Sequence, residues 1–173
     1  FSPANAKLVK LEKKTGKLYS FSMLSGHNCP FAKDCLSRAV KQNDGTMIIV
    51  DGKDTVFRCF SASQEVLFPA VYAQRKHNQD AIRSCKNDMA KMRDMILEAM
   101  PLKSKIIRIH IGADFITANY FRAWCDVARL TPNVLFYAYT KSLRFWVADR
   151  NYIPENMILT ASRGGLEDSL ISQ

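Results

Sequence analysis

Three cysteines in the first third of the chain have the residue type needed for a metal or cluster site. Cys29 and Cys35 lie in a polar stretch, Cys59 follows in an aromatic one, and the spacing is C-x5-C-x23-C. No standard metal-binding motif has this spacing. His27 comes two residues before the first cysteine. Soft thiolates bind soft metal ions or iron–sulfur clusters, so these residues predict a metal or iron–sulfur centre.

Two kinds of metal centre are compatible with these ligands, and a third interpretation needs no metal. A structural zinc ion takes four ligands, and His27 would complete a Cys₃His set. A four-iron cluster (4Fe-4S) held by three cysteines would leave one iron open to a small molecule. The third interpretation is three unrelated buried thiols. The other two cysteines, Cys85 and Cys125, lie on apolar faces of predicted helices, where a free cysteine packs as a small core residue.

A second group of polar residues is predicted at the carboxyl edge of a parallel sheet. His110 lies near the end of a predicted strand at 106–111, and Asp114 follows it. Strand alternation puts Arg108 and His110 on one face and the isoleucines between them on the other. His110 and Asp114 are therefore the candidate catalytic or ligand residues, with acid–base chemistry as their role. The alternative is a structural role: His110 would be a hydrogen-bonded polar residue of the sheet, or Asp114 would cap a helix.

The next two predicted strands also end in polar residues. Lys141 follows the strand at 134–139, and Ser162 and Arg163 follow the strand at 157–161. Cations at this edge would hold a phosphate, a carboxylate or a nucleic-acid backbone. Gly164 and Gly165 precede a helix start, where backbone N–H groups can contact an anion. Nearby tyrosines at 137 and 139 would either stack on bases or pack in the core.

The first 62 residues read as hairpins around the cysteine-bearing loop. Partial alternation at 8–12 and 18–23, with a Thr-Gly turn between them, predicts one hairpin. Residues 24–45 form a loop with a short helix at 32–40. The segments 47–50 and 55–60 flank an Asp-Gly turn and predict a second hairpin.

Residues 63–173 change to helical periods and then alternate between strands and helices. A capped helix is predicted at 63–71, and a longer one at 80–100 is stopped by Pro101. Strands at 106–111, 134–139 and 157–161 enclose helices at 117–130 and 142–149. This β-α-β-α-β order predicts a parallel sheet with right-handed crossovers. We therefore expect a single α/β domain over residues 1–173.

Composition and charge limit the class of protein. Hydrophobic residues make up 47% and charged residues 24%, which is ordinary for a globular protein. No apolar run approaches the roughly 18 residues that span a bilayer, so no membrane is expected. The net charge of +9 favours a polyanionic partner such as nucleic acid, or serves solubility alone. Five cysteines without a secretory leader favour a reducing cytosol.

Five ordered motifs resemble the bacteriophage "gene product 88" family: GHNCP, FRCFSAS, RIHIGADF, FYAYTKS and LTAS, beginning at residues 26, 57, 108, 136 and 159. The resemblance covers about residues 18–166 and implies a phage or prophage origin and a location in the host cytoplasm.

The family is also distantly similar to three-cysteine phage proteins with a radical S-adenosylmethionine-like barrel. That similarity implies a TIM-like or partial barrel and S-adenosylmethionine as a cofactor. The radical enzymes carry C-x3-C-x2-C, a pattern from which this chain departs. Family members continue further, so this chain would be C-terminally truncated or a shorter version.

The leading hypothesis is an iron–sulfur protein with Cys29, Cys35 and Cys59 as ligands and His27 as a possible fourth. It would be a redox or radical-type enzyme acting on a nucleotide or nucleic acid. The open side of the cluster would be lined by the remaining candidates, His110, Asp114, Lys141, Ser162 and Arg163. The competing hypothesis is a non-enzymatic, zinc-stabilised basic module that binds nucleic acid or a host protein. A metal-free nuclease or transferase using His110 and Asp114 is the third.

Overall fold

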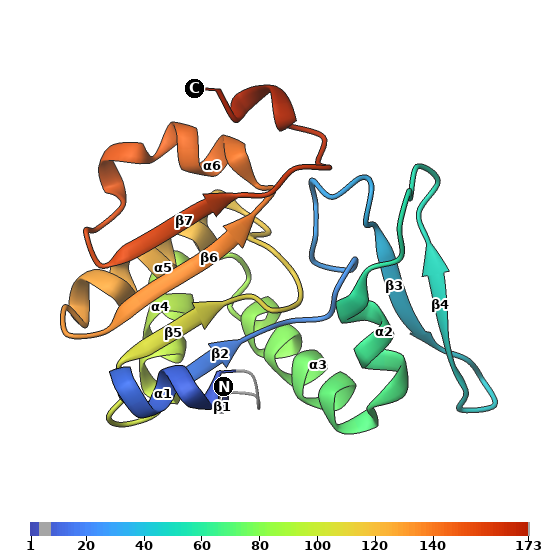
Figure 1. The fold of residues 1–173 in the computed structure, drawn as a ribbon, viewed down its shortest axis with the longest axis horizontal. Helices are drawn as coiled ribbons and strands as arrows, with labels where there is room; N and C mark the ends of the chain where they lie inside the picture. The colour runs from blue at the N-terminus through green and yellow to red at the C-terminus, as the bar shows by residue number, and fades with distance from the viewer. Residues whose placement is uncertain (4–7, 173) are drawn as a thin grey trace.

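In the computed structural model, which describes residues 1–3 and 8–172, the strands form two sheets (Figure 1). The larger has the order β1-β2-β5-β6-β7, with β1 antiparallel to β2 and the other neighbours parallel. The smaller is the antiparallel pair β3–β4. A mixed α/β fold is thus confirmed, and the described residues contain no closed barrel. The strands are, in order, Ser2–Pro3, Leu18–Phe21, Ser37–Lys41, Met47–Asp51, Ile106–Ile109, Leu135–Thr140 and Met157–Ala161.

Helices α4 and α5 lie behind the larger sheet in Figure 1 and bury the apolar face of its strands. The core between them is aromatic, with Trp124 and Phe121 of α5 fully buried alongside Phe136 of β6. The Thr117 hydroxyl begins α5 by accepting a hydrogen bond from the Tyr120 N–H at 3.1 Å. The helices are α1 Val9–Thr15, α2 Phe60–Leu67, α3 Pro69–Ser84, α4 Met89–Ala99, α5 Ala118–Leu130 and α6 Leu143–Ala148. Short 3₁₀ turns follow at Arg150–Tyr152 and Asp168–Leu170.

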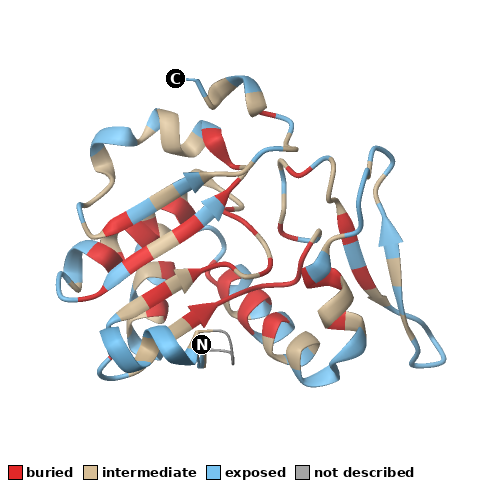
Figure 2. Cartoon of the chain, in the orientation of Figure 1, coloured by how far each residue is buried: buried red, intermediate tan, exposed pale blue. Residues whose placement is uncertain are grey.

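The opposite face of the larger sheet is only partly covered, with α2 and α3 facing its β2 and β5 strands across a cavity. Figure 2 shows buried and exposed positions alternating along β6. Phe136 and Ala138 are buried in the core, whereas Tyr139, which points to the opposite face of β6, is 51% exposed. Arg108 of β5 lies over the Tyr137 and Tyr139 rings, at 6.0 and 5.5 Å from their centroids. The sheet therefore has one apolar covered face and one polar, aromatic face that is partly open.

The predicted N-terminal hairpin is wrong in its first arm. Residues 9–15 form helix α1, which ends at Gly16 with a φ of 91°. The second arm is confirmed as β2, but β2 pairs with β1 and β5 rather than with residues 8–12. The short segment around Leu8 and Leu11 has apolar residues three apart, a spacing that fits a helix as well as a loosely alternating strand.

The second hairpin exists but is shifted toward the N-terminus. The strands are β3 and β4, so the helix predicted at 32–40 and the strand predicted at 55–60 are both wrong. The turn lies at Asp44 and Gly45, not at residues 51–54: Gly45 has a φ of 88°, and the Asp44 carboxylate accepts from the Thr46 N–H at 2.9 Å. Two Asp-Gly pairs compete in this sequence, and the first forms the hairpin turn.

The long helix predicted at 80–100 is two helices, α3 and α4. The chain leaves the helical conformation at Lys86 and Asn87, whose φ angles are 50° and 60°. Asp88 then begins α4, its side chain accepting from the Lys91 N–H at 3.1 Å. The helix predicted at 63–71 corresponds to α2, which ends before Pro69 because proline fits only the first turn of the next helix. No helix among the described residues is long and apolar enough to cross a membrane.

Candidate functional site: a three-cysteine cavity

Three segments that are far apart in the sequence meet around one cavity of about 300 Å³. The loop after β2 brings Cys29 and Cys35, and the residue before α2 is Cys59. The carboxyl ends of β5, β6 and β7 supply the opposite wall, as the order of parallel strands predicts. Seven of the nine predicted site residues line the cavity: Cys29, Cys35, Cys59, Asp114, Lys141, Ser162 and Arg163. We call it the cysteine cavity.

Backbone hydrogen bonds hold the cysteines in place. The Gly26 N–H donates to the Cys29 sulfur at 3.2 Å. Gly26 has a φ of 70°, and a Cβ there would collide with the Ser37 carbonyl, so the turn requires glycine. The Cys59 N–H donates to the Ser37 hydroxyl at 3.1 Å. The β3 strand thus fixes both the loop that carries Cys29 and the residue that precedes α2.

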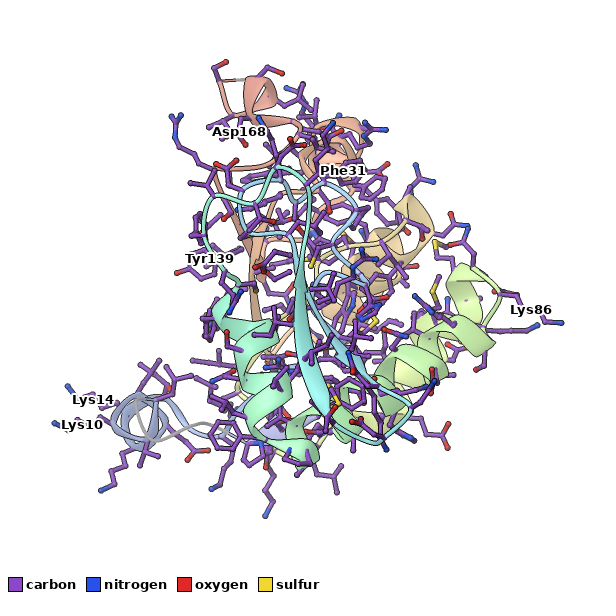
Figure 3. The ribbon with its side chains drawn as sticks, turned by 90° about the vertical axis from the view of Figure 1, so that its right-hand side faces the viewer. Lys10, Lys14, Phe31, Lys86, Tyr139 and Asp168 are labelled. Atoms are coloured by element: carbon purple, nitrogen blue, oxygen red, sulfur yellow. The ribbon has the colours of Figure 1, made fainter. Side chains whose placement is uncertain are left out.

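The rest of the cysteine loop is attached to the segment after β7. The N–H groups of Lys33 and Asp34 both donate to the Gly164 carbonyl, at 3.2 and 3.0 Å. Ala32 and Gly165 form an isolated β-bridge. Phe31 and Asp168 therefore lie near each other at one end of the molecule, with Lys10 and Lys14 of α1 at the other end (Figure 3). The cavity is closed on one side by these loop-to-loop contacts.

Burial and neighbouring negative charge raise the pKa of two of the thiols, Cys29 and Cys35. Burial raises the pKa of Cys29 far above its usual range, and the nearby Asp114 carboxylate, Cys59 and Cys35 raise it further. Burial also raises the pKa of Cys35, against the opposing effect of the Lys141 ammonium group. Each thiolate would thus repel the others across the cavity. A metal that bound here would have to displace these protons, so its affinity would rise with pH.

The three thiols, as the described residues are placed, do not form a ready site for a single metal ion. Among residues 1–3 and 8–172, no group of three or more His, Cys, Asp or Glu side chains could hold one metal ion. A zinc ion would need every sulfur at about 2.3 Å from its centre, which requires the thiols to lie close together. An iron–sulfur cluster is larger than an ion, so its thiolate ligands stand further apart.

His27 does not line the cysteine cavity. Its imidazole is exposed, and Nε2 donates to the Ala39 carbonyl of β3 at 3.0 Å. It lies on another hollow, which Pro30 and Arg83 line and which shares only Cys29 of the three thiols with the cysteine cavity. The structure therefore does not bring His27 to the three thiols as a fourth ligand.

His110 lies in the core rather than on the Arg108 face, which corrects the face predicted from alternation. The residue has a φ of 64°, so β5 ends at Ile109 and the alternation stops there. Its Nε2 is 3.0 Å from the Tyr120 hydroxyl of α5, and its ring packs edge-on against Phe115 at 5.1 Å. Burial lowers the pKa of His110 to about 3, so the imidazole is neutral at ordinary pH.

Asp114 lies on the cavity wall and organises it. Its carboxylate accepts hydrogen bonds from the Thr140 hydroxyl at 2.6 Å and from the N–H groups of Phe115 and Lys141 at 2.8 and 2.7 Å. Its own N–H donates to the Asn28 carbonyl at 2.8 Å. Burial nevertheless raises the pKa of Asp114, against the effect of the hydrogen bonds. One residue thus joins three segments: its side chain contacts the loop after β5 and the end of β6, and its backbone N–H contacts the cysteine loop.

The polar groups after β6 and β7 are bound to each other. The Lys141 ammonium donates to the Ser162 hydroxyl at 2.9 Å and to the Arg163 carbonyl. The N–H groups of Gly164 and Gly165 donate to the Asp168 carboxylate at 2.8 and 2.9 Å. The predicted glycine anion site is therefore taken by a carboxylate of the chain itself, whereas Lys141 and Arg163 still line the cavity.

A buried ion pair beneath the cavity was not predicted. Glu65 is fully buried, and its carboxylate lies 2.7 Å from the Arg75 guanidinium. It also accepts from the N–H and hydroxyl of Ser25, at 3.0 and 2.9 Å, at the start of the cysteine loop. Arg75 donates to the Ser61 hydroxyl at 2.7 Å, two residues after Cys59. The sequence contains only a weak indication of this ion pair: two residues of opposite charge, Glu65 and Arg75, on two helices that carry both polar and apolar residues.

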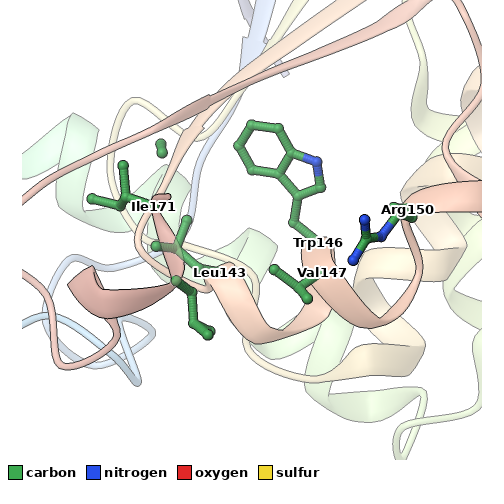
Figure 4. A pocket seen from close by; sticks show the side chains of 7 residues that line it. Leu143, Trp146, Val147, Arg150 and Ile171 are labelled. Atoms are coloured by element: carbon green, nitrogen blue, oxygen red, sulfur yellow. The ribbon is translucent and has the colours of Figure 1, made fainter. Parts of the chain in front are cut away.

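A smaller apolar cavity of about 190 Å³ lies between α6 and the last 3₁₀ turn. Figure 4 shows Trp146, Val147 and Arg150 of this region beside Leu143 and Ile171. Among the described residues, its lining is mainly apolar and contains no thiol, histidine or carboxylate.

Comparison with known proteins agrees with the motifs of the sequence. The "Gene 88 protein" of Mycobacterium phage L5 is 29% identical over 90 residues, which cover 48% of this chain and 38% of that protein. The chain thus spans well under two thirds of this relative's length. No solved structure was found to match this chain. The family described as Gene product 88 matches residues 1–173. The chain therefore belongs to the Gene product 88 family of bacteriophage proteins, as its five ordered motifs indicated.

Proposed function

We propose that this phage protein binds an iron–sulfur cluster (4Fe-4S) through Cys29, Cys35 and Cys59. The observation that supports the proposal is the convergence of these thiols, from two separate segments, on the cysteine cavity. The other two cysteines, Cys85 and Cys125, are buried in the core and do not line this cavity. A cluster at this position supplies one-electron chemistry, and with three protein ligands it keeps one iron open to a small molecule such as S-adenosylmethionine.

The cavity residues would serve the cluster and its ligand in different ways. Lys141 and Arg163 place positive charge beside the thiolates, which lowers the cost of gathering negative charge there. Asp114 links the loop after β5 to the end of β6 and to the cysteine loop. Of the two predicted acid–base residues, His110 and Asp114, it is the one that lines the cavity. The enzymatic proposal is a redox or radical reaction on a nucleotide or nucleic acid in the host cytoplasm.

A partial TIM-like barrel is the finer fold assignment that accompanies this proposal. The strands β2, β5, β6 and β7 are parallel and fully covered on one face only. In a barrel of this type the other face is the inner one, and reactive groups lie at the carboxyl ends of the strands. The cysteine cavity is at those ends.

Anaerobic reconstitution with iron and sulfide tests the proposal directly. We expect visible iron–sulfur absorption and several irons per chain, lost in Cys29→Ala, Cys35→Ala and Cys59→Ala. Cys85→Ala is the matched control, because Cys85 is buried away from the cavity, and it should retain the iron. Full iron content in Cys59→Ala would sink the assignment, as would a reconstituted wild-type chain without iron.

The second candidate is a zinc-stabilised, non-enzymatic module that binds nucleic acid or a host protein. The net charge of +9 and the exposed lysines of α1 favour it (Figure 3). Zinc would require the thiols to move closer together and His27 to leave the Ala39 carbonyl. One zinc per chain, unfolding on chelation and DNA affinity that falls steeply with salt would support this candidate. Binding to a protein partner would be much less dependent on salt.

A further inference from the structure

A larger cavity, of about 610 Å³, adjoins the cysteine cavity on the partly open face of the sheet. Phe60 and Ile111 line both cavities, so the two share a wall. Its volume falls in the range of small-molecule sites in proteins. Arg108 of β5 lies on its sheet side and α2 and α3 border it opposite. We call it the Arg108 cavity.

The Arg108 cavity is positively charged. Its lining contains Arg75 and Arg108 and no carboxylate. Arg75 is neutralised by Glu65 at 2.7 Å, but Arg108 forms no ion pair with any described residue. The Nε atom of Arg108 is buried and has no hydrogen-bond partner within the described part of the chain. A buried donor without an acceptor is costly, so this guanidinium is prepared for an anion.

Two tyrosines hold the guanidinium in a fixed orientation. The Arg108 guanidinium carbon lies 5.5 Å from the Tyr139 ring centroid and 6.0 Å from the Tyr137 centroid. Stacking on aromatic rings restrains an arginine without using the charge that an anion needs. A planar guanidinium presents parallel N–H donors that match the oxygens of a phosphate or carboxylate. The expected ligand group is therefore an anion with several oxygens.

Exposed aromatic rings border the same space. Phe60 is 60% exposed and lines both cavities, and Tyr139 is 51% exposed on the wall of the cysteine cavity. Aromatic rings that lie open beside cationic groups are stacking platforms for nucleobases. A ligand that uses Phe60, Tyr139 and Arg108 must combine a flat ring with a negatively charged group.

We propose that the Arg108 cavity binds a 5′-mononucleotide, with the phosphate on Arg108 and the base against Phe60 and Tyr139. The inference names the substrate class of the proposed enzyme. It rests on that proposed function only in placing the nucleotide beside the cysteines. Binding itself depends on Arg108 and the aromatic rings, not on the cluster.

Equilibrium dialysis of the full chain with each of the four ribonucleoside 5′-monophosphates, adenosine and inorganic phosphate tests the proposal. At least one mononucleotide should bind more tightly than adenosine and phosphate. Arg108→Gln should weaken its binding about ten- to a hundredfold, the effect of losing a charged hydrogen bond. Arg93→Gln, on α4, should leave binding unchanged. Failure of every mononucleotide to bind, or equal weakening by Arg93→Gln, would overturn the site.

A second variant separates the base from the phosphate and guards against a folding artefact. Phe60→Ala removes an exposed ring that is not one of the two stacked on Arg108, so it should weaken the mononucleotide while leaving inorganic phosphate unchanged. Circular dichroism checks the fold of each variant. If Arg108→Gln does not fold, Phe60→Ala decides alone, and unchanged mononucleotide affinity in it rejects base stacking and the nucleotide assignment.

Iron content measured on the same samples distinguishes the two proposals. Arg108→Gln should retain reconstituted iron and lose nucleotide affinity, whereas Cys59→Ala should lose iron and retain nucleotide affinity. Nucleotide binding by a chain that takes up no iron would leave the Arg108 site standing and reject the cluster. Iron uptake without nucleotide binding would leave the cluster proposal standing and reject the Arg108 site.

Discussion

The Asp114 carboxylate accepts a hydrogen bond from the backbone N–H of Lys141 at 2.7 Å. The two residues follow neighbouring parallel strands, β5 and β6. The hydrogen bond therefore connects the two chain segments beyond the point where the β5–β6 pairing ends. Lys141 then reaches the Ser162 hydroxyl beyond β7 at 2.9 Å. Three successive strand ends are thereby linked into one cavity wall.

Replacing Asp114 tests whether this link holds the wall together. Both carboxylate oxygens of Asp114 accept hydrogen bonds, one from the Thr140 hydroxyl and the other from the Lys141 N–H. In Asp114→Asn the amide NH₂ replaces one of these acceptors with a donor, so one buried hydrogen bond is lost. We expect a loss of about 1–3 kcal/mol in the free energy of unfolding, measured by urea denaturation. Asp94→Asn, on the exposed surface of α4, is the matched control, and a similar loss in both variants would contradict the assigned role.

The buried His110 should make stability fall in mild acid. Burial lowers the pKa of His110 to about 3, whereas the unfolded chain titrates near 6.5. The unfolded state therefore binds the extra proton first. The contribution of the neutral imidazole is complete above about pH 6.5 and decreases as the pH falls toward 3, by up to about 1.4 kcal/mol per pH unit.

His110→Asn is the variant that isolates this effect, because asparagine tolerates the positive φ of the site. Urea denaturation at several values between pH 7 and 4.5 should show a stability difference between wild type and variant that shrinks as the pH falls. A difference that stays constant over this range would show that His110 becomes protonated without cost, against its burial.

The buried pair of Glu65 and Arg75 should be far more sensitive to substitution than a surface pair. Glu65→Gln leaves the nearly buried Arg75 guanidinium without a counter-charge, so we expect a loss of about 3–5 kcal/mol. Asp80→Asn breaks the exposed pair with Lys76 on the same helix and should cost less than about 1 kcal/mol. Thermal unfolding measures both, and comparable losses would argue against a buried network under Ser25.

Gly112 should tolerate no side chain because the walls of the cavity meet there. A Cβ at this position would lie 2.5 Å from the Ser61 hydroxyl and 2.6 Å from the Ser25 hydroxyl. Gly112→Ala should therefore cost about 1–3 kcal/mol through overpacking and displace the residues next to Cys59. Gly45→Ala should also be destabilising, since Gly45 has a positive φ, but it has no neighbour within 4 Å.

Iron uptake separates the two glycine variants. Only Gly112→Ala should reduce reconstituted iron, because only Gly112 packs beside the cysteine cavity. Equal iron content in both variants would mean that this packing does not position the thiols.

The second half of the fold was predictable because its local signals are strong and agree with one another. The helix expected at 117–130 is α5, Ala118–Leu130, and the strand expected at 157–161 is β7. A clear apolar stripe and a turn before each strand fixed both. The first half was not predictable in detail, since β3 reads as polar: its buried residues are Ser37 and Ala39, which give no hydrophobic pattern.

The cysteines of the candidate site were predictable because thiols are rare and had no helical explanation. His110 was misplaced for a physical reason: alternation assumes that a strand continues, and a single left-handed residue ends β5. No pattern in Ile-His-Ile reports that change of φ. Glu65 and Arg75 were missed because a buried ion pair is defined by tertiary packing, which the spacing of charges along two helices does not record.

The parallel pairing of β2 with β5 has a consequence for the rate of folding. It brings together residues such as Ser22 and Ile111, which are 89 positions apart. Closing so long a loop is entropically costly and must precede the contacts that reward it, which slows folding. The cysteine loop lies inside that stretch, so its thiols stay separated and open to oxidation until the slowest pairing is complete.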